Sequence, residues 1–290
     1  MEKYVLFIPN GGINDCFSRI SAVISYCKLK KRILLLDMTN SCYKINFSDY
    51  FNIDKLDCDI IYNSNDIKNI LLDLENRNLM TVHPNNLDFN LIDLFDTNEI
   101  RFEYHNRKSP YYTYKKIPLN LPDIVDENII LHSRCGGGDG YHFFKYLLLH
   151  ENIKNIISKK ISLLKDNYLC IQVRNTDYRC DYRKLYRNNK KMIDNFDSVY
   201  LCTDSRSVFD FFKSKCSNVI CFTTFPEGEY KNLHEAPTNK ISPVQRMEDL
   251  LTDIFIASNS KTFLSNSMGG FVKFLRNCRN NKNRVLKMLK

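Results

Sequence analysis

The sequence lacks the signatures of several protein classes. No window approaches the ~18 uninterrupted apolar residues of a membrane span. The apolar run at the amino terminus reaches a Pro-Asn-Gly-Gly turn within ten residues, which is too short for a secretory signal. No segment has the low complexity of a disordered chain, and 43% of the residues are hydrophobic. We therefore expect a folded, cytoplasmic protein without an integral membrane segment.

Signatures of disulfide frameworks and metal sites are missing too. The eleven cysteines are odd in number, and several, such as Cys170 and Cys202, lie in apolar runs, where a reduced thiol behaves as a small hydrophobic side chain. No Cys/His cluster has zinc spacing. The nearest pair, Cys216 and Cys221, straddles a turn into a strand and is more typical of a core. These patterns predict a reducing compartment and no metal or other cofactor.

The charge balance is basic. A formal net charge of +9 is consistent with an anionic ligand, whether a nucleotide, a phosphate or a nucleic acid. The Lys and Arg residues are scattered rather than gathered into one stripe, so a generally basic surface fits equally well. Charge alone does not choose between these interpretations.

Apolar periodicity predicts two α/β domains, residues 1–150 and 151–290, in line with a prior of ~150 residues per domain. Both sheets should be mostly parallel, because strands and helices alternate. Strands are expected at 4–8, 33–36, 59–62, 79–82, 129–131, 169–173, 198–203, 219–223 and 262–264. Helices are expected from Ile13, at 67–74, 141–149, 153–164, 208–212 and 247–256, and after Gly269-Gly270. The first turn does not match the G-x-G-x-x-G fingerprint, so a dinucleotide cofactor has little support.

Three segments have more than one interpretation. Asp57-Cys58-Asp59 matches a metal-binding D-x-D, but it precedes its strand instead of ending it, which disfavours a metal. Residues 100–122 interleave aromatic and basic side chains, which suits a sugar or nucleic-acid surface or an ordinary loop. Residues 136–140, G-G-G-D-G, fit a phosphate cradle, a mobile active-site loop or a turn. We favour a loop near an interdomain cleft.

The stretch Tyr168–Tyr182 is the most informative. A buried strand ends at Val173, and Arg174 and Asp177 follow at its carboxyl end, where open α/β sheets present ligand-binding groups. A second candidate anion site comes later, at Ser265-Asn266-Ser267 before Gly269-Gly270. Small hydroxylated residues and free N–H groups at a strand-to-helix turn favour phosphate.

The order of four motifs resembles the fucosyltransferase superfamily, which includes the nodulation and core α1,6-fucosyltransferases and the α1,2-fucosyltransferases. The opening G-G-I-N-D-C-F-S-R is similar to the G-x-G-D-C segment of the nodulation enzymes, and Gly140-Tyr141 with the following helix to a G-Y-F-Q segment of the α1,2 enzymes. Q-V-R-N-T-D-Y is similar to the H-x-R-R-x-D motif, and D-I-F-I-A-S…S-N-S-M-G-G to the closing segment. The resemblance spans most of the chain.

This resemblance implies a GT-B fold with two Rossmann-like domains facing across a cleft. It also implies an inverting, metal-independent transferase. The second domain would hold the nucleotide sugar and the first domain the glycan acceptor, with no nucleic-acid partner. The oligomeric state is left open.

Site residues follow from the same resemblance. Arg174 corresponds to the arginine that binds the diphosphate, since its planar fork suits two phosphate oxygens; the alternative is a structural pair with Asp177. Asp253 corresponds to the carboxylate that contacts the base or ribose of the nucleotide. The alternative is a structural role, in which its side chain lies on a helix face or caps the helix. The other predicted substrate-binding residues are Gly11, Gly12, Asn14, Asp177, Asp204, Ser265, Asn266 and Ser267.

Two positions depart from the family pattern. Asn175 stands where many members have a second arginine, and Gln172 where many have histidine. Arg174 then carries more of the leaving-group charge, with Arg179 or Arg183 as candidates to compensate. An oxocarbenium-like transition state needs only modest activation of the acceptor hydroxyl. The candidate bases are Asp181 and Asp15.

The sequence therefore predicts transfer of L-fucose from GDP-fucose to a glycan hydroxyl. Asn175 keeps another nucleotide sugar, such as a UDP-sugar, as an alternative. A second alternative is a non-catalytic, basic glycan- or nucleic-acid-binding protein on the same fold. The sequence names neither the acceptor nor the linkage.

Overall fold

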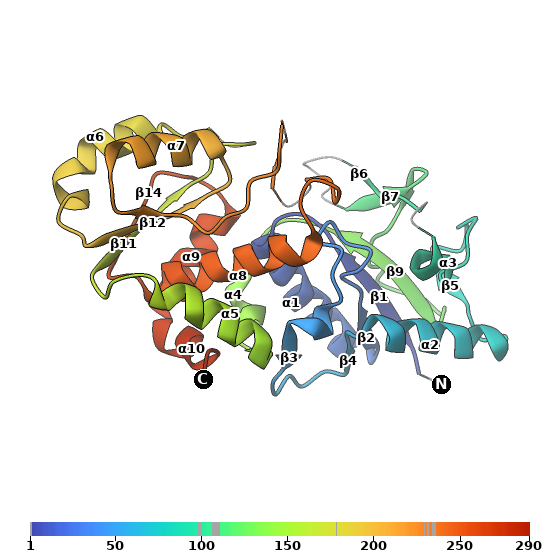
Figure 1. Cartoon of the computed structure of the whole chain (residues 1–290). Coiled ribbons are helices and arrows are strands. Elements are labelled where there is room, and N and C mark those ends of the chain that lie inside the picture. The colour runs from blue at the N-terminus through green and yellow to red at the C-terminus, as the bar shows by residue number, and fades with distance from the viewer. Residues whose placement is uncertain are drawn as a thin grey trace. The chain divides into compact units, whose positions relative to one another are not determined.

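Two parallel sheets, one in each half of the chain, organise the computed structural model, which describes residues 2–97, 100–105, 111–177, 179–228, 230, 232–233 and 236–290 (Figure 1). The chain divides into two units, 1–148 and 149–290. The α/β class and the parallel sheets agree with the sequence-based expectation. Within the described residues, no helix combines the length and apolar character needed to cross a bilayer.

The sheet of unit 1 has the order β4-β2-β1-β9-β5, and every neighbouring pair is parallel. Its two longest strands, β1 and β9, are in register from Tyr4↔Ile129 to Pro9↔Arg134. All five strands therefore end at one edge of the sheet, where ligand-binding loops of such sheets gather. The strands are β1 (Tyr4–Pro9), β2 (Ile33–Leu36), β4 (Ile60–Ile61), β5 (Val82–His83) and β9 (Ile129–Arg134).

Helices cover the unit 1 sheet because strand side chains alternate between its faces. Leu6 and Ile8 share a buried cluster with Leu71 of α2 (Ser64–Asn76). The longest helix, α1 (Ile13–Lys30), directly follows β1 and buries apolar residues at helical spacing. The smaller elements are η1 (Phe47–Asp49), β3 (Phe51–Ile53), α3 (Asp93–Asp96), β6 (Glu103–Tyr104), β7 (Tyr112–Tyr114), β8 (Ile117–Pro118), α4 (Tyr141–Phe144) and β10 (Leu147–Leu149).

Two expectations for unit 1 were wrong in detail, and a third segment has more order than the loop interpretation assumed. The predicted helix 141–149 stops at Phe144, and Leu147–Leu149 forms β10 instead, because this segment pairs with β3. The predicted strand 79–82 begins only at Val82, since Leu79 still closes the end of α2 through its N–H to Leu74 O. Residues 100–122 are not a plain loop but carry the antiparallel strands β6, β7 and β8; residues 106–110 of that segment lie outside the described residues.

The sheet of unit 2 has the order β13-β12-β11-β14, again all parallel. Its strands are β11 (Tyr168–Val173), β12 (Ser198–Thr203), β13 (Val219–Ile220) and β14 (Thr262–Ser265). The strand expected at 219–223 ends early, at Ile220. The three longer strands end next to one another, so Arg174, Asp204 and Asn266 begin neighbouring loops.

Helices cover both faces of the unit 2 sheet (Figure 1). Ile171 and Leu201 pack with Phe212 on the face of α6 and α7, while Tyr168 Oη donates to Ile256 O of α8 on the other face. The sequence did not indicate α6, whose buried residues are few among many charges. The helices are α5 (Glu151–Ser162), α6 (Tyr182–Ile193), α7 (Arg206–Lys215), α8 (Pro243–Asn259), α9 (Gly270–Asn280) and α10 (Lys282–Lys287).

Candidate functional site

Arg174 lies immediately after β11, at the carboxyl edge of the unit 2 sheet. Its backbone N–H donates to Ser267 Oγ at 3.0 Å, and the next N–H, of Asn175, donates to Asp204 Oδ1 at 2.8 Å. The loops after β14 and β12 thus hold the turn after β11 from both sides. This bracing fixes the backbone from which the guanidinium projects.

The guanidinium of Arg174 is oriented by carboxylates. Nε and Nη2 donate to the two oxygens of Asp177 at 2.8 and 2.6 Å, a bidentate fork. Asp204 Oδ2 lies 3.9 Å from Nε and accepts from Thr176 Oγ1 at 2.6 Å. Burial raises the pKa of Asp204 above its ordinary value, and the hydrogen bond from Thr176 opposes that rise. The Arg–Asp pair considered from the sequence is therefore present.

The pair with Asp177 uses Nε and Nη2 of Arg174, and Nη1 points elsewhere. A methyl group placed on Gly269 would lie 3.8 Å from Nη1. Gly269 is the N-cap of α9, and no side chain caps that helix start. A helix amino terminus favours anions through its free N–H groups and its dipole. Arg174 and the start of α9 therefore form one candidate anion site within unit 2.

The hydroxyls of the loop after β14 brace this site. Ser265 Oγ donates to Gln172 Oε1 at 2.6 Å and accepts from the N–H of Ser267 at 3.1 Å. Asn266 Nδ2 donates to the backbone oxygen of Asp181 at 2.9 Å. The loop is thereby tied to β11 and to the start of α6. The phosphate contacts expected of Ser265, Asn266 and Ser267 stay predictions.

Asp181 has a structural role at the start of α6. It is the N-cap, and its Oδ1 accepts from the N–H of Lys184 at 2.9 Å, a bond that stabilises a helix start. The guanidinium of Arg183 lies over the ring of Phe211 at 5.0 Å. Arg179 is exposed. Neighbouring Tyr178 lies outside the described residues.

Asp253 lies on α8, in the interior of unit 2, where its side chain contacts β12. Tyr200 Oη donates to its carboxylate at 2.5 Å, and only 8% of the residue is exposed. Burial raises its pKa to about 7, opposed by hydrogen bonds from Tyr200 and Cys202. This carboxylate thus has protein partners in its own unit, and its contact with a base or ribose stays a prediction.

In unit 1 the predicted residues cluster at the carboxyl edge of β1. Gly11 has a φ of +95°, which strains any other residue, and a methyl group there would lie 3.0 Å from Cys135 Cβ, a tight contact. Gly12 is the N-cap of α1. A methyl group on Gly11 or on Gly12 would lie 3.6 or 3.8 Å from Asp15 Oδ2, so this carboxylate lies against the turn.

Asn14 holds the glycine-rich loop that follows β9. Its Nδ2 donates to Gly138 O at 3.1 Å, and its Oδ1 accepts from the N–H of Gly140 at 3.0 Å. Ser18 Oγ donates to Gly137 O at 3.0 Å. The 136–140 loop is therefore bound along α1, and both polar groups of the Asn14 side chain are engaged there. A substrate contact of Asn14 stays a prediction.

Sequence reasoning missed one feature of this edge, the side chains of Arg19 and Arg134. Arg19 lies on α1 in the turn after Asp15, and Arg134 is the last residue of β9. The Nε atoms of both are buried and have no hydrogen-bond partner among the described residues. In the sequence their only signal is their position. Arg19 falls in the helix after the first strand and Arg134 at the end of a later strand, and the βαβ pattern brings these two places to one edge of the sheet.

The other sequence candidates stay apart from these clusters. Asp57 is fully exposed and pairs with Lys28 at 3.6 Å. In the described ranges, no group of three or more His, Cys, Asp or Glu residues is arranged to hold a metal ion. Cys216 is buried, and burial raises the pKa of the Cys221 thiol to about 12, as in a core pair.

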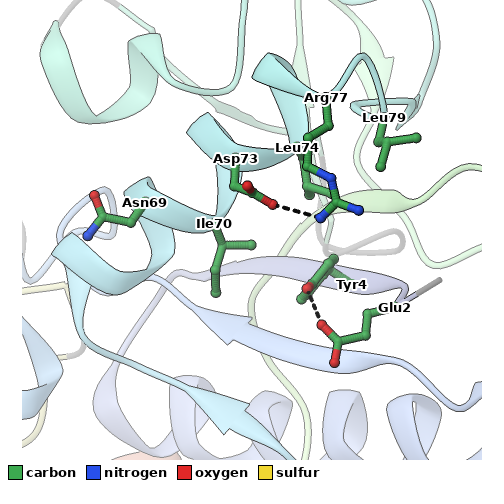
Figure 2. A pocket seen from close by; sticks show the side chains of 8 residues that line it. All are labelled: Glu2, Tyr4, Asn69, Ile70, Asp73, Leu74, Arg77 and Leu79. Atoms are coloured by element: carbon green, nitrogen blue, oxygen red, sulfur yellow. Dashed lines mark hydrogen bonds and ion pairs between the residues drawn. The ribbon is translucent and has the colours of Figure 1, made fainter.

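A hollow of about 520 Å³ opens at the other edge of unit 1, where β1 begins (Figure 2). Arg77 there pairs with Asp73 at 3.1 Å, and Tyr4 Oη donates to Glu2 at 2.7 Å. Its charged groups are thus satisfied by one another. The edge that carries the glycine turns is the opposite one.

Comparison with solved structures supports the fold. No family model and no curated protein matches the sequence. A NodZ α-1,6-fucosyltransferase co-crystallised with GDP matches with a TM-score of 0.56 and 16% identity, over 95% of this chain and 92% of that one; NodZ from Bradyrhizobium gives the same values. POFUT1 in complex with GDP matches with a TM-score of 0.56 and 12% identity, over 96% and 95%. The chain thus has the GT-B fold of these fucosyltransferases over nearly its whole length.

Proposed function

We propose that this chain is an inverting, metal-independent glycosyltransferase that transfers L-fucose from GDP-fucose to a glycan hydroxyl. The observation that carries the proposal is the position of Arg174. Its guanidinium is fixed by Asp177 at the carboxyl edge of β11, with Nη1 toward the start of α9. The fold is shared with enzymes solved with GDP and with GDP-fucose.

In the proposed reaction the acceptor hydroxyl attacks the anomeric carbon of the donor sugar while the bond from that carbon to the β-phosphate oxygen breaks. The electron pair of the broken bond leaves with GDP, so negative charge grows on the diphosphate. Arg174 and the first N–H groups of α9 stabilise that charge, because they are oriented before the reaction begins. Asp204 and Ser267 hold the Arg174 backbone in place.

The proton of the acceptor hydroxyl goes to a carboxylate. We assign this role to Asp15, since it lies against the Gly11-Gly12 turn of unit 1, the unit expected to hold the acceptor. Asp181, the other candidate, already accepts the capping N–H of α6. The contacts of Asp253 with the base or ribose, and of Gly11, Gly12 and Asn14 with substrate, belong to the same proposal.

A nucleotide panel tests the donor. GDP, UDP, ADP and CMP are titrated into the full chain by calorimetry, with thermal shift as a second readout, because a ligand that binds the native state raises the midpoint, and at equal concentration the tighter ligand raises it more. GDP should bind most tightly. A response to UDP and none to GDP would mean another nucleotide sugar. Binding of an oligonucleotide with steep salt dependence, and of no nucleoside diphosphate, would mean a binding protein.

Turnover provides the second arm of the test. GDP-fucose is incubated with a glycan library, and product is detected by mass spectrometry with and without EDTA. Fucosylated product should form equally in both, with inverted anomeric configuration by NMR. Loss of product in EDTA would contradict the metal-independent mechanism and bring Asp57 and Asp59 back into consideration.

A further inference from the structure

Two arginines of unit 1 carry positive charge that no described side chain of the protein neutralises. Arg19 and Arg134 are both partly exposed, yet each has a buried Nε without a partner. Neither side chain takes part in a hydrogen bond or ion pair in the described parts of the chain. A buried donor without a partner costs free energy, so the protein itself does not satisfy these guanidinium groups.

The fold brings these two side chains together. Arg134 ends β9 opposite Pro9, the end of β1. The residue before Arg19, Ser18, donates to Gly137 O in the loop that follows Arg134, so α1 and this loop are held side by side. Burial lowers the pKa of the Arg19 guanidinium, and so does the neighbouring charge of Arg134. Two guanidinium groups at one edge of the sheet are a natural site for an anion, since guanidinium groups bind carboxylate and phosphate oxygens as a fork.

Aromatic side chains lie next to the arginines. Tyr111 forms an isolated antiparallel bridge with Arg134, and its ring stacks on His105 at 5.0 Å between centroids. Tyr104, 44% exposed, packs against Tyr112 with 5.6 Å between ring centroids. Amphipathic rings beside a charged group suit a sugar, whose C–H faces pack on aromatic rings while its polar groups bond at the rim.

We propose that Arg19, Arg134, Tyr104 and Tyr111 form a subsite for an anionic saccharide, one whose carboxylate or phosphate is held by the two guanidinium groups. This inference rests on the proposed function in one respect, because it makes the acceptor an acidic glycan. It excludes a neutral glycan as the preferred acceptor. Nucleic acid is the rival ligand, with phosphates and bases in place of the acid and the sugar ring.

The experiment measures this binding without any donor. The full chain in HEPES buffer is titrated with glucuronate, glucose 6-phosphate and glucose, which differ at C6, while GDP is titrated separately. Variants are Arg19→Gln with Arg134→Gln, the double Lys variant that keeps both charges, and Arg77→Gln as control. Arg77 is also in unit 1 but at the opposite edge, paired with Asp73.

One or both acids should raise the thermal midpoint of the wild type and of Arg77→Gln, and glucose should not. A response to glucuronate alone assigns a carboxylate, and a response to glucose 6-phosphate alone assigns a phosphate. The double Gln variant should bind the acid at least tenfold more weakly, with the double Lys variant in between. GDP affinity should change less than threefold in all of them. GDP failing to bind the wild type while the acids bind through the pair would end the GDP-fucose assignment and leave this subsite standing.

Four results would overturn the inference. The first two are that neither acid binds, or that glucose binds as well as the acids. The third is that the double Gln variant binds the acid with unchanged affinity. The fourth is that this variant loses GDP binding, which would place the arginines in the donor site. A uridine oligonucleotide that binds through the pair more tightly than either acid would replace the saccharide with nucleic acid. Circular dichroism of each variant checks its fold.

Discussion

The arginines at the carboxyl edges of the two sheets differ in their partners. In unit 2, Arg174 is held by both oxygens of Asp177 and lies 3.9 Å from Asp204. In unit 1, Arg19 has the positive charge of Arg134 as its neighbour and no described carboxylate partner. The first arrangement is complete without a ligand, and the second is not.

This difference teaches how each edge can act. An arginine that is already oriented loses little freedom when a charge develops beside it, which suits stabilisation of a transition state. Two arginines without a carboxylate partner form new favourable interactions when an anion binds, which suits recognition of the bound substrate before the reaction begins. We therefore expect loss of the unit 2 arginine, Arg174, to affect turnover, and loss of the unit 1 arginines, Arg19 and Arg134, to affect binding of the acceptor.

The largest expected effect comes from Arg174→Ala. Removing an oriented donor from a developing oxyanion costs about 10²–10³-fold in kcat, and we expect the upper part of that range because Asn175 supplies no second cation. The matched control is Arg183→Ala, which removes a guanidinium that lies over Phe211. The measurement is kcat from product formation, with thermal midpoints to show that both variants fold. Near-normal turnover of Arg174→Ala would remove the contrast between the two edges.

The second comparison is between the two candidate bases, one on each unit. Asp15→Asn should lower kcat by about 10²-fold, the lower end for general-base catalysis, because an oxocarbenium-like transition state needs little activation of the nucleophile. Asp181→Asn should stay within about threefold, and its free energy of unfolding should change by less than ~0.5 kcal/mol, since Asn caps helices as well as Asp does. Equilibrium urea unfolding measures the latter. A loss confined to Asp181→Asn would move the base to unit 2.

The sequence predicted the long buried strands well, because their apolar runs are continuous. Residues 169–173 and 198–203 were expected as strands and lie in β11 and β12. Sequence reasoning failed where charged or aromatic residues obscure the apolar periodicity of a helix or strand. In α6 the buried residues Leu185, Tyr186 and Ile193 are spread among basic side chains, and the short strands β6 to β8 gain their order from pairing with one another.

The position of Arg174 at the end of a strand was predictable from the sequence, but its hydrogen-bond partners were not. That Arg174 follows a buried strand is a local fact of the sequence. That Ser267 Oγ accepts from its N–H, or that Asn14 binds the loop at Gly138, depends on contacts between distant segments. The placement of Arg19 and Arg134 at one edge could not be predicted for the same reason, since no distinctive motif surrounds either residue in the sequence.

The smallest expected effect compares the interiors of the two units through their pH dependence. In unit 2, burial raises the pKa of Asp253 to about 7, above the ~3.9 of an unfolded chain. The folded state then binds this proton more tightly, so the stability it contributes is full below pH ~4 and is lost as the pH rises to 7. In unit 1, burial lowers the pKa of His132 to about 3. Its contribution is present above the ordinary histidine value of ~6.5 and is lost as the pH falls toward 3.

Asp253→Asn removes the first dependence, because Asn still accepts from Tyr200 but cannot ionise. Between pH 5 and 8 the wild type should lose about 2–3 kcal/mol of stability relative to this variant. Hydrogen exchange resolves the units, since peptides from α8 and β12 should show the difference and peptides from β9 should not. Parallel curves for the two proteins would mean that the carboxyl is ionised throughout this range. GDP affinity then decides its role: a tenfold loss in Asp253→Asn supports contact with the nucleotide, whereas an unchanged affinity confines Asp253 to the interior and separates it from the Arg174 edge.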